Sequence, residues 1–229
     1  MKTKVFLSGA TGKMGLEIQA LLGLDPQLTL GCILDRTSML SPLSHSHPIW
    51  IDFSHDQFLL QLLQKMMKEK KYPCLLTGTT NLSDATVVAL KDYSKFAPVL
   101  WTPNTSLGVG IIETLFPLLA LGLKDYQWSL QETHHIQKKD APSGTARRWT
   151  EKIQQLIKGK QVRVESFRES NVIGTHVLKI KGQYEEITLQ HQATDRKLFA
   201  QGALMLTQQL IRYPFGYYDM ESFLSQGQG

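Results

Sequence analysis

The segment from residue 132 to residue 146, E-T-H-H-I-Q-K-K-D-A-P-S-G-T-A, combines more chemically active side chains than any other part of this chain. In an extended strand, alternate side chains point to opposite faces, so His134 and Lys138 would point one way and His135 the other. A histidine can donate a proton near neutral pH, and a lysine supplies positive charge or a second proton. We therefore interpret His134 and Lys138 as a candidate catalytic pair.

The same segment ends in a candidate anion site. The residues D-A-P-S-G-T predict a helix start with a proline near its first turn. The first N–H groups of a helix have no acceptor within it and bind anions readily. The main chain of Gly144 and Thr145 is thus expected to hold a carboxylate. The alternative is a surface strand with paired histidines, followed by an ordinary capped helix.

A metal site is not expected. Neighbouring histidines on a strand point apart, and neither H-E-x-x-H nor C-x-x-C occurs in the sequence. His45 and His47 lie in a serine-rich stretch and are expected at the surface.

A glycine-rich stretch near the N-terminus follows an apolar run and opens a helical pattern. Such a turn lets the main chain approach a pyrophosphate, which the helix N-terminus then binds. The spacing G-x-x-G-x-x-G is looser than the usual dinucleotide fingerprint, so a simple packing turn is the alternative. The residues of this candidate cofactor turn are Gly9, Ala10, Thr11, Gly12, Lys13, Met14 and Gly15.

Further candidate cofactor residues follow other expected strands. Asp35 lies about 20 residues after the last glycine, where an acid binds the adenosine ribose, and Arg36 could bind a 2′-phosphate. Asp35 favours NADH and Arg36 favours NADPH, so we expect both to be accepted. Ligands of open α/β sheets bind at the carboxyl ends of the strands. The candidate residues expected there are Gly78, Thr79, Thr80, Thr102, Pro103, Asn104 and Thr105, and D-F-S at 52–54 has the same placement.

The elements that must position these residues form an α/β pattern. Short apolar runs alternate with helical patterns, which predicts a parallel sheet with helices on both faces. Strands are expected at residues 4–7, 28–34, 49–53, 74–77 and 98–101, and helical patterns at 16–22, 58–67 and 83–93. Residues 36–48, rich in Ser and Pro, are expected to form a loop in place of a crossover helix.

The second half of the chain predicts an α+β domain. An apolar helix is expected over residues 107–123, with a kink at Pro117. Strands are expected at 128–136, 162–167, 175–180 and 185–192, with a helix over 143–157 among them. The last two strands are expected to form a hairpin through 181–183. A final helix over 198–211 precedes an aromatic tail.

Composition narrows the class of protein. A chain of 229 residues with 42% apolar and 20% charged residues is typical of a globular protein with one large or two small domains. The net charge of +5 comes mostly from scattered residues, which disfavours nucleic-acid binding. Cys32 and Cys74 lie in apolar runs without metal or disulfide spacing, and are expected to be thiols in a reducing compartment. The first apolar run is too short for a signal peptide, and no stretch suits a bilayer, so a cytoplasmic location is expected.

Together these motifs resemble the 4-hydroxy-tetrahydrodipicolinate reductase (dihydrodipicolinate reductase) family of lysine and diaminopimelate biosynthesis. The resemblance covers nearly the whole chain. Its motifs are the glycine turn, D-F-S, G-T-T, T-P-N-T-S-L-G-V, the 132–146 segment, R-E-S-N-V-I-G-T-H and the terminal Y-D-M. It implies reduction of 4-hydroxy-tetrahydrodipicolinate by NADH or NADPH with loss of water.

The resemblance also implies roles for individual residues. His134 would be the general acid/base and Lys138 the proton donor, although the sequence alone does not divide these roles. Bound substrate carboxylates would contact His135, Gly144 and Thr145. The glycine turn, Asp35, Arg36 and the segments 78–80 and 102–105 would bind the dinucleotide.

The implied architecture has two domains. An N-terminal Rossmann dinucleotide-binding domain would comprise residues 1–105 and 206–229. A C-terminal α+β domain with a mixed sheet, residues 106–205, would bind the small dicarboxylate substrate and build a homotetramer. No nucleic acid or membrane partner is expected.

Three departures from the family pattern and two alternatives accompany this interpretation. Residues 36–48 are fewer than usual, Ile136-Gln137 replaces a more basic pair, and Ser170 stands where a glycine is usual. None removes a group that the chemistry requires. The alternatives are another Rossmann-fold reductase acting on an imine or aldehyde acid, and a non-catalytic dinucleotide-sensing protein. The His134–Lys138 pair argues against the sensor.

Overall fold

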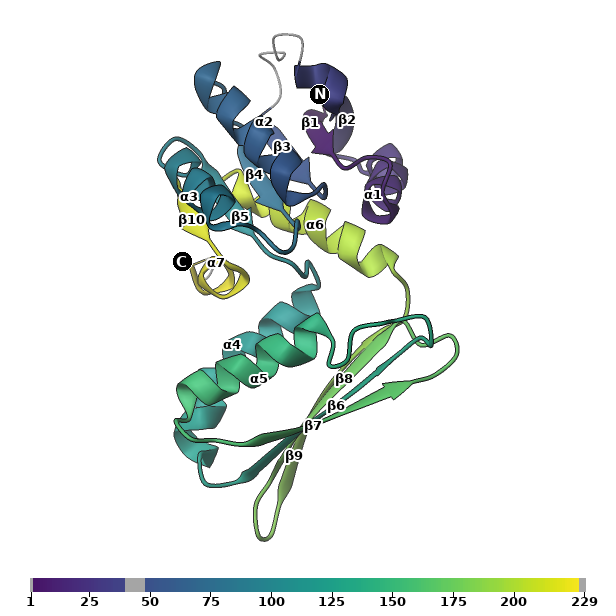
Figure 1. Cartoon of the computed structure of the whole chain (residues 1–229), viewed down its shortest axis with the longest axis vertical. Helices are drawn as coiled ribbons and strands as arrows, with labels where there is room; N and C mark the ends of the chain where they lie inside the picture. The colour runs from purple at the N-terminus through teal and green to yellow at the C-terminus, as the bar shows by residue number, and fades with distance from the viewer. Residues whose placement is uncertain (1, 40–47, 227–229) are drawn as a thin grey trace. The chain divides into compact units, whose positions relative to one another are not determined.

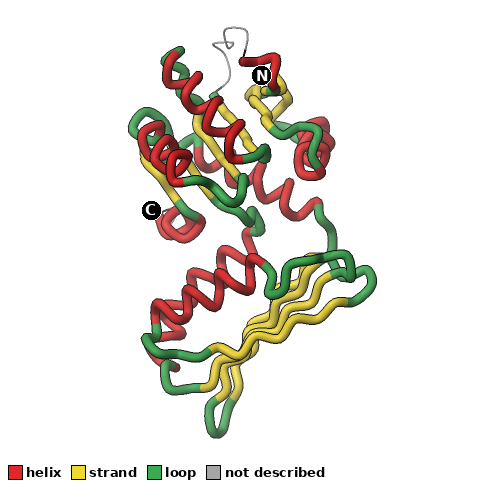
Figure 2. Tube along the Cα trace, in the orientation of Figure 1, coloured by secondary structure: helices red, strands yellow, loops and turns green. Residues whose placement is uncertain are grey.

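The structure is a computed structural model that describes residues 2–39 and 48–226. The chain forms two compact units (Figures 1 and 2): a first unit of Met1–Ser106 with Phe199–Gly229, and a second unit of Leu107–Leu198. The expected division placed the return to the first domain at residue 206. In the structure it falls at Phe199, near the start of the last long helix, α6 (Lys197–Leu210).

The first unit contains a six-stranded parallel sheet with the order β10-β5-β4-β3-β1-β2. Its strands are β1 (Thr3–Ser8), β2 (Leu28–Leu34), β3 (Ile49–Asp52), β4 (Cys74–Thr77), β5 (Pro98–Trp101) and β10 (Gly216–Tyr218). All residues of β3 and β4 are buried, as is usual where helices cover both faces of a parallel sheet. The strand order reverses at β1, and the crevice at such a point is where open α/β sheets bind ligands.

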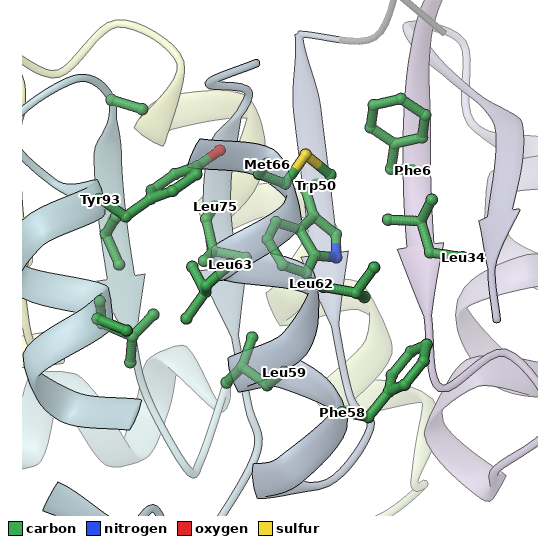
Figure 3. Packing of buried hydrophobic residues seen from close by; sticks show 14 residues of the cluster. Phe6, Leu34, Trp50, Phe58, Leu59, Leu62, Leu63, Met66, Leu75 and Tyr93 are labelled. Atoms are coloured by element: carbon green, nitrogen blue, oxygen red, sulfur yellow. The ribbon is translucent and has the colours of Figure 1, made fainter. Parts of the chain in front are cut away.

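Helices pack against this sheet through alternate strand residues. They are α1 (Lys13–Leu24), α2 (Asp56–Lys68), α3 (Asp84–Tyr93), α6 and α7 (Met220–Gln226), with a 3₁₀ turn η1 at Arg36–Met39. Figure 3 shows Trp50 and Leu75 of the sheet packed with Leu62 of α2 and Tyr93 of α3.

The second unit has a mixed four-stranded sheet with the order β7-β6-β8-β9. Its elements are α4 (Leu107–Leu123), β6 (Gln127–His134), α5 (Gly144–Leu156), β7 (Val162–Arg168), β8 (Gly174–Lys181) and β9 (Glu186–Ala193). β7 runs parallel to β6, and the other neighbours are antiparallel. Every second residue of β6 is buried, beneath a core in which Phe116 of α4 meets Trp149 of α5 edge-on. The predicted Rossmann sheet and mixed-sheet domain are both confirmed.

The structure corrects three local predictions. β6 ends at His134, two residues early, because a turn follows. The helical pattern at 16–22 predicts that its first residue, Leu16, packs inward, but Leu16 is 59% exposed and α1 buries Gly15, Ile18 and Leu22. The aromatic tail forms β10 and α7, which are too short to show a periodic pattern. Residues 36–39 of the expected 36–48 loop form the 3₁₀ turn η1, and residues 40–47 lie outside the described part.

Among residues 2–39 and 48–226, the structure contains no helix that is both long and apolar enough to cross a membrane.

Candidate active site

The glycine turn after β1 has a shape that only glycine permits. Gly9 has φ +77°, and a Cβ there would lie 2.1 Å from the main-chain oxygen of Phe53. A Cβ at Gly15 would lie 2.2 Å from the oxygen of Gly9. Gly12 caps α1 without a side-chain hydrogen bond. The turn therefore brings bare main chain to the start of α1, a geometry that suits a phosphate group.

A buried carboxylate fastens the strand ends beside this turn. Asp52, at the end of β3, is fully buried and accepts hydrogen bonds of 2.5–2.7 Å from the hydroxyl groups of Ser8, Ser54, Thr77 and Thr79. Ser8 ends β1 and Thr77 ends β4, so one side chain joins three neighbouring strands. The sequence pattern did not predict this network, although the D-F-S motif at 52–54 contains two of its residues.

The candidate cofactor segments 78–80 and 102–105 lie at the carboxyl ends of β4 and β5. Several of their side chains form hydrogen bonds within the protein. Thr79 donates to Asp52, Thr102 to the oxygen of Asn104 and Thr105 to the oxygen of Phe199. Gly78 leaves room for the Phe53 ring, which a Cβ would approach to 2.2 Å. The more exposed groups here are those of Thr80 and Pro103. These segments would therefore offer a ligand mainly their main chain.

Asp35 and Arg36 lie at the carboxyl end of β2, beside β1. The Asp35 carboxylate accepts hydrogen bonds from the Thr37 N–H, at 2.9 Å, and from its hydroxyl, at 2.6 Å. Asp35 thereby caps η1, which begins at Arg36, and both side chains are exposed.

In the second unit, β6 carries a buried acid–histidine pair at its carboxyl end. Oε2 of the completely buried Glu132 contacts Nδ1 of His134, and neither atom has another hydrogen-bond partner in the described part of the chain. The other oxygen, Oε1, accepts from Arg168 Nη1 at 3.1 Å. Glu132 and His134 share a face because they are two residues apart on a strand. That spacing is visible in the sequence, but Glu132 was not recognised as a functional partner.

The surroundings fix the charge of this pair. Burial raises the pKa of Glu132, but hydrogen bonds from Ser166 and Arg168, with the charges of His134 and Arg168, outweigh it and leave the pKa below its usual range. Burial lowers the pKa of His134; the Glu132 charge opposes this and the Lys138 charge adds to it, so the pKa lies below the usual value. A neutral His134 with its proton on Nδ1 leaves Nε2 as the nitrogen that can exchange a proton.

His176 of β8 lies behind His134, with ring centroids 5.2 Å apart. Burial lowers its pKa to about 3, so it stays neutral over the physiological range. Its Nε2 shares a hydrogen bond of 3.1 Å with Ser143 Oγ, and Ser143 caps α5 by accepting the Ala146 N–H. His176 thus connects the surroundings of His134 to the helix start.

Helix α5 begins at Gly144, so the residues of the predicted anion site, Gly144 and Thr145, lie in its first turn. Ser143 is the cap and accepts the third N–H of the helix. Helix geometry points the first two, those of Gly144 and Thr145, out of the helix end. Gly144 is exposed and Thr145 half-buried.

Lys138 reaches this region by a route that differs from the prediction. It lies in a turn, where its N–H donates to the His135 oxygen at 3.0 Å, rather than on an extended strand. Its Nζ pairs with Asp140 at 2.8 Å, and its charge acts on His134. His135 is half-buried, with Nε2 3.4 Å from Arg196 Nη2, a cation that the sequence analysis did not identify.

Glu132, His134 and His176 bring possible metal-ligand atoms within 4.8 Å of one another. Each also has a protein partner: Arg168 on Glu132, Glu132 on His134, and Ser143 on His176. We interpret the group as a proton-transfer cluster, because each possible ligand already has a partner within the protein.

A Rossmann-type sheet with a glycine turn that opens a helix, together with a second unit holding an acid–histidine pair, is typical of dinucleotide-dependent oxidoreductases. Two family models match the chain: "Dihydrodipicolinate reductase, N-terminus" over residues 3–105 and "Dihydrodipicolinate reductase, C-terminus" over 108–224. The chain belongs to the dihydrodipicolinate reductase family, which confirms the resemblance drawn from its motifs.

Individual relatives agree. A protein of Bdellovibrio bacteriovorus named 4-hydroxy-tetrahydrodipicolinate reductase is 33% identical over 225 residues, covering 97% of this chain and 96% of the relative. One of the same name from Xanthomonas axonopodis pv. citri is 32% identical over 229 residues, covering 94% of each. A dipicolinate-bound dihydrodipicolinate reductase from Paenisporosarcina sp. TG-14 has the same fold, with a TM-score of 0.77 at 18% identity over 96% of this chain and 98% of that one.

Proposed function

We propose that this protein reduces 4-hydroxy-tetrahydrodipicolinate to tetrahydrodipicolinate with loss of water, using NADH or NADPH, in lysine and diaminopimelate biosynthesis. The family and the names of its full-length relatives support this reaction. The observation that carries it for this chain is the Glu132–His134 pair in the same unit as Lys138 and the start of α5.

The substrate is a small dicarboxylate, and the second unit offers groups that suit its charge. One carboxylate binds the N–H groups of Gly144 and Thr145, because a helix start favours anions. For the other carboxylate, His135 offers a ring nitrogen, and its neighbour Arg196 and Lys138 add positive charge. The structural neighbour is bound to dipicolinate, a dicarboxylate.

Proton transfer falls to His134 and Lys138. Glu132 holds Nδ1 of His134, so Nε2 gives or takes the proton, and the Glu132 charge stabilises the imidazolium that forms. The Lys138 ammonium is a second proton source, held by Asp140. The nicotinamide, when bound, supplies the hydride to the substrate ring.

The first unit suits a dinucleotide, because the turn between Gly9 and Gly15 has no room for side chains at these two positions and exposes its main chain to a ligand. The start of α1, at Gly12 to Met14, holds the pyrophosphate. Asp35 accepts from ribose hydroxyl groups and Arg36 binds a 2′-phosphate, which is why we propose that both cofactors serve. The main chain of 78–80 and 102–105 completes the site.

The direct test is oxidation of NADH and of NADPH by the purified protein, with the substrate made in place from pyruvate and aspartate semialdehyde by its synthase. Oxidation that depends on the synthase is the expected result, and the ratio of the two rates measures the cofactor preference. Folded protein that oxidises neither cofactor would contradict the proposal. A panel of imine and aldehyde acids would then identify a different reductase.

The proposal also includes a homotetramer in the cytoplasm. The helices α4 and α5 cover one face of the second unit's sheet, and its half-buried residues, such as Gln131 of β6, alternate toward the other face. That face is the proposed contact between copies. Light scattering during size-exclusion chromatography measures the molar mass of the assembly, and a monomeric mass would refute the proposed tetramer.

A further inference from the structure

The geometry points to a buried ion pair, Glu132–Arg168, as the device that positions both proton-transfer groups, with Glu132 orienting His134 and Arg168 holding the turn that carries Lys138. This inference rests on the proposed roles of His134 and Lys138. Neither Glu132 nor Arg168 is placed against substrate or cofactor, so both are positioning residues.

The Glu132 carboxylate has three partners: Ser166 donates a hydrogen bond to it, and His134 and Arg168 each meet a different one of its oxygens. Oε2 contacts His134 and Oε1 accepts from Arg168, while the whole side chain is excluded from solvent. A buried carboxylate is costly unless it is paired and hydrogen-bonded, so this arrangement resists change. It fixes the orientation of the imidazole ring and puts the proton on Nδ1. Nε2 then points toward Gly174, where a Cβ would lie 3.0 Å away.

The Arg168 guanidinium binds the main chain of the turn that follows β6 and carries Lys138. Its Nε donates to the Lys138 oxygen at 3.2 Å and its Nη2 to the Asp140 oxygen at 2.5 Å. The same group reaches Glu132 through Nη1. These contacts hold the main chain on both sides of Lys139, which is exposed. A lysine could not reproduce them, because they need the planar fork of an arginine.

The sheet supplies the rigid base for this clamp. β6 and β7 pair in parallel with His134 opposite Arg168, and the Glu169 N–H donates to the His134 oxygen at 2.9 Å. Glu132 and Arg168, which are 36 positions apart in sequence, thus meet near the ends of two hydrogen-bonded strands. One guanidinium therefore sets the place of both His134 and Lys138.

The test compares Glu132→Gln and Arg168→Lys with Glu165→Gln and Arg163→Lys. The controls make the same exchanges in a second acid–arginine pair, Arg163–Glu165 of β7, which is more exposed. Because Glu165 accepts a hydrogen bond from Gln131 on the proposed contact face, light scattering first checks that these control variants keep the wild-type assembly. Charged groups around His134 are Glu132 on β6, Lys138 in the turn and Arg168 on β7, with the neutral His176 on β8. Glu132→Gln removes the only negative charge among them.

We expect Glu132→Gln to lower kcat roughly 10²-fold, with KM for NADH little changed, and to move the His134 limb of the pH–kcat profile to lower pH. Arg168→Lys should lower kcat and raise KM for the dicarboxylate, because the turn loosens. Glu132→Asp should recover part of the activity. Unchanged kcat and pH profile in both test variants, or equal losses in the controls, would overturn the inference.

An NMR titration separates this inference from the proposed reaction. The His134 ring signals, assigned with His134→Gln, are followed with pH in the wild type, Glu132→Gln and Arg168→Lys. We expect the titration of His134 to move to lower pH in Glu132→Gln, and its ring signals to broaden in Arg168→Lys. Unmoved signals in folded variants would overturn the positioning role even if the enzyme were inactive on the proposed substrate. An inactive wild type with the expected NMR shifts would overturn only the reaction.

Discussion

Single residues in the second unit act on one another through charge. The Lys138 ammonium pairs with Asp140 and lowers the proton affinity of His134, which Glu132 raises. The two candidate proton carriers are therefore not independent. A change in either one alters both the number of available protons and the pH at which the other titrates.

We predict that Lys138→Met lowers kcat about 10²- to 10³-fold, because a proton source and a cationic group are lost together. The pKa of His134 should rise, since the Lys138 charge holds it down. Steady-state kinetics and a histidine NMR titration measure the two effects. Lys139→Met, which removes the exposed neighbouring charge, is the control; a loss of kcat equal to that of Lys138→Met would argue against a specific role for Lys138.

A second residue-scale prediction concerns Gly174, at the start of β8. A Cβ there would lie 3.0 Å from Nε2 of His134, so Gly174→Ala should displace the imidazole and lower kcat about tenfold without weakening NADH binding. Gly122→Ala in α4, where no described atom outside the helix's own adjacent backbone lies within 4 Å of the added atom, should leave kcat unchanged. Normal turnover by Gly174→Ala would mean that Nε2 is not the reacting nitrogen.

At the scale of elements, the proposed cofactor site of the first unit depends on buried hydrogen bonds that hold the carboxyl ends of the strands together. The Asp52 side chain connects the ends of β1, β3 and β4 through hydroxyl donors. The loops that follow these strands include the glycine turn and the G-T-T segment, which carry most of the proposed dinucleotide contacts. Cofactor affinity should therefore depend on a side chain that is too deeply buried to touch the cofactor.

We predict that Asp52→Asn lowers the free energy of unfolding by about 2–4 kcal/mol, because an amide nitrogen cannot accept the hydroxyl hydrogen bonds that a carboxylate oxygen accepts. The dissociation constant for NADH should rise at the same time, because the loops are no longer held. Urea titration and NADH fluorescence measure the two quantities. Asp92→Asn, in an exposed pair with Lys95, should change neither. An unchanged NADH affinity in Asp52→Asn would show that the loops hold their shape without it.

At the scale of the whole molecule, buried histidines couple stability to pH. The pKa of His176 is lowered by burial to about 3, and those of His134 and His191 are also lowered by burial. An unfolded chain binds these protons near pH 6.5, as an ordinary histidine does. The unfolded state therefore takes up more protons as the pH falls. The stability from His176 is present above about pH 6.5 and is lost between there and about pH 3.

We predict that the free energy of unfolding falls more steeply below pH 6.5 in the wild type than in His176→Asn, by up to about 1.4 kcal/mol per pH unit. Urea titrations at about pH 7.5, 6.5 and 5.5 give the slopes. The comparison of slopes isolates His176, since the other titrating groups are common to both proteins. Parallel slopes would mean that His176 is not buried as a neutral ring.

Most local elements and the family could be predicted from the residues alone. The strands at 28–34, 74–77 and 98–101 and the helix at 107–123 were predicted with the bounds that the structure has, because periodicity is a local property of the chain. Ser83, the first residue of the helical pattern predicted at 83–93, is the cap of α3. Motif spacing likewise identified the glycine turn and the 132–146 segment.

Contacts between residues far apart in the chain could not be predicted and are set by the fold. Glu132 and Arg168, and Asp52 and its hydroxyl donors on β1 and β4, come together through strand order and register. The same holds for β10 beside β5, and for Lys138, which a turn rather than a strand brings into place. The physical reason is that a buried carboxylate must find its donors wherever the fold places them, and strand pairing, which sets those places, leaves no local signature in the chain.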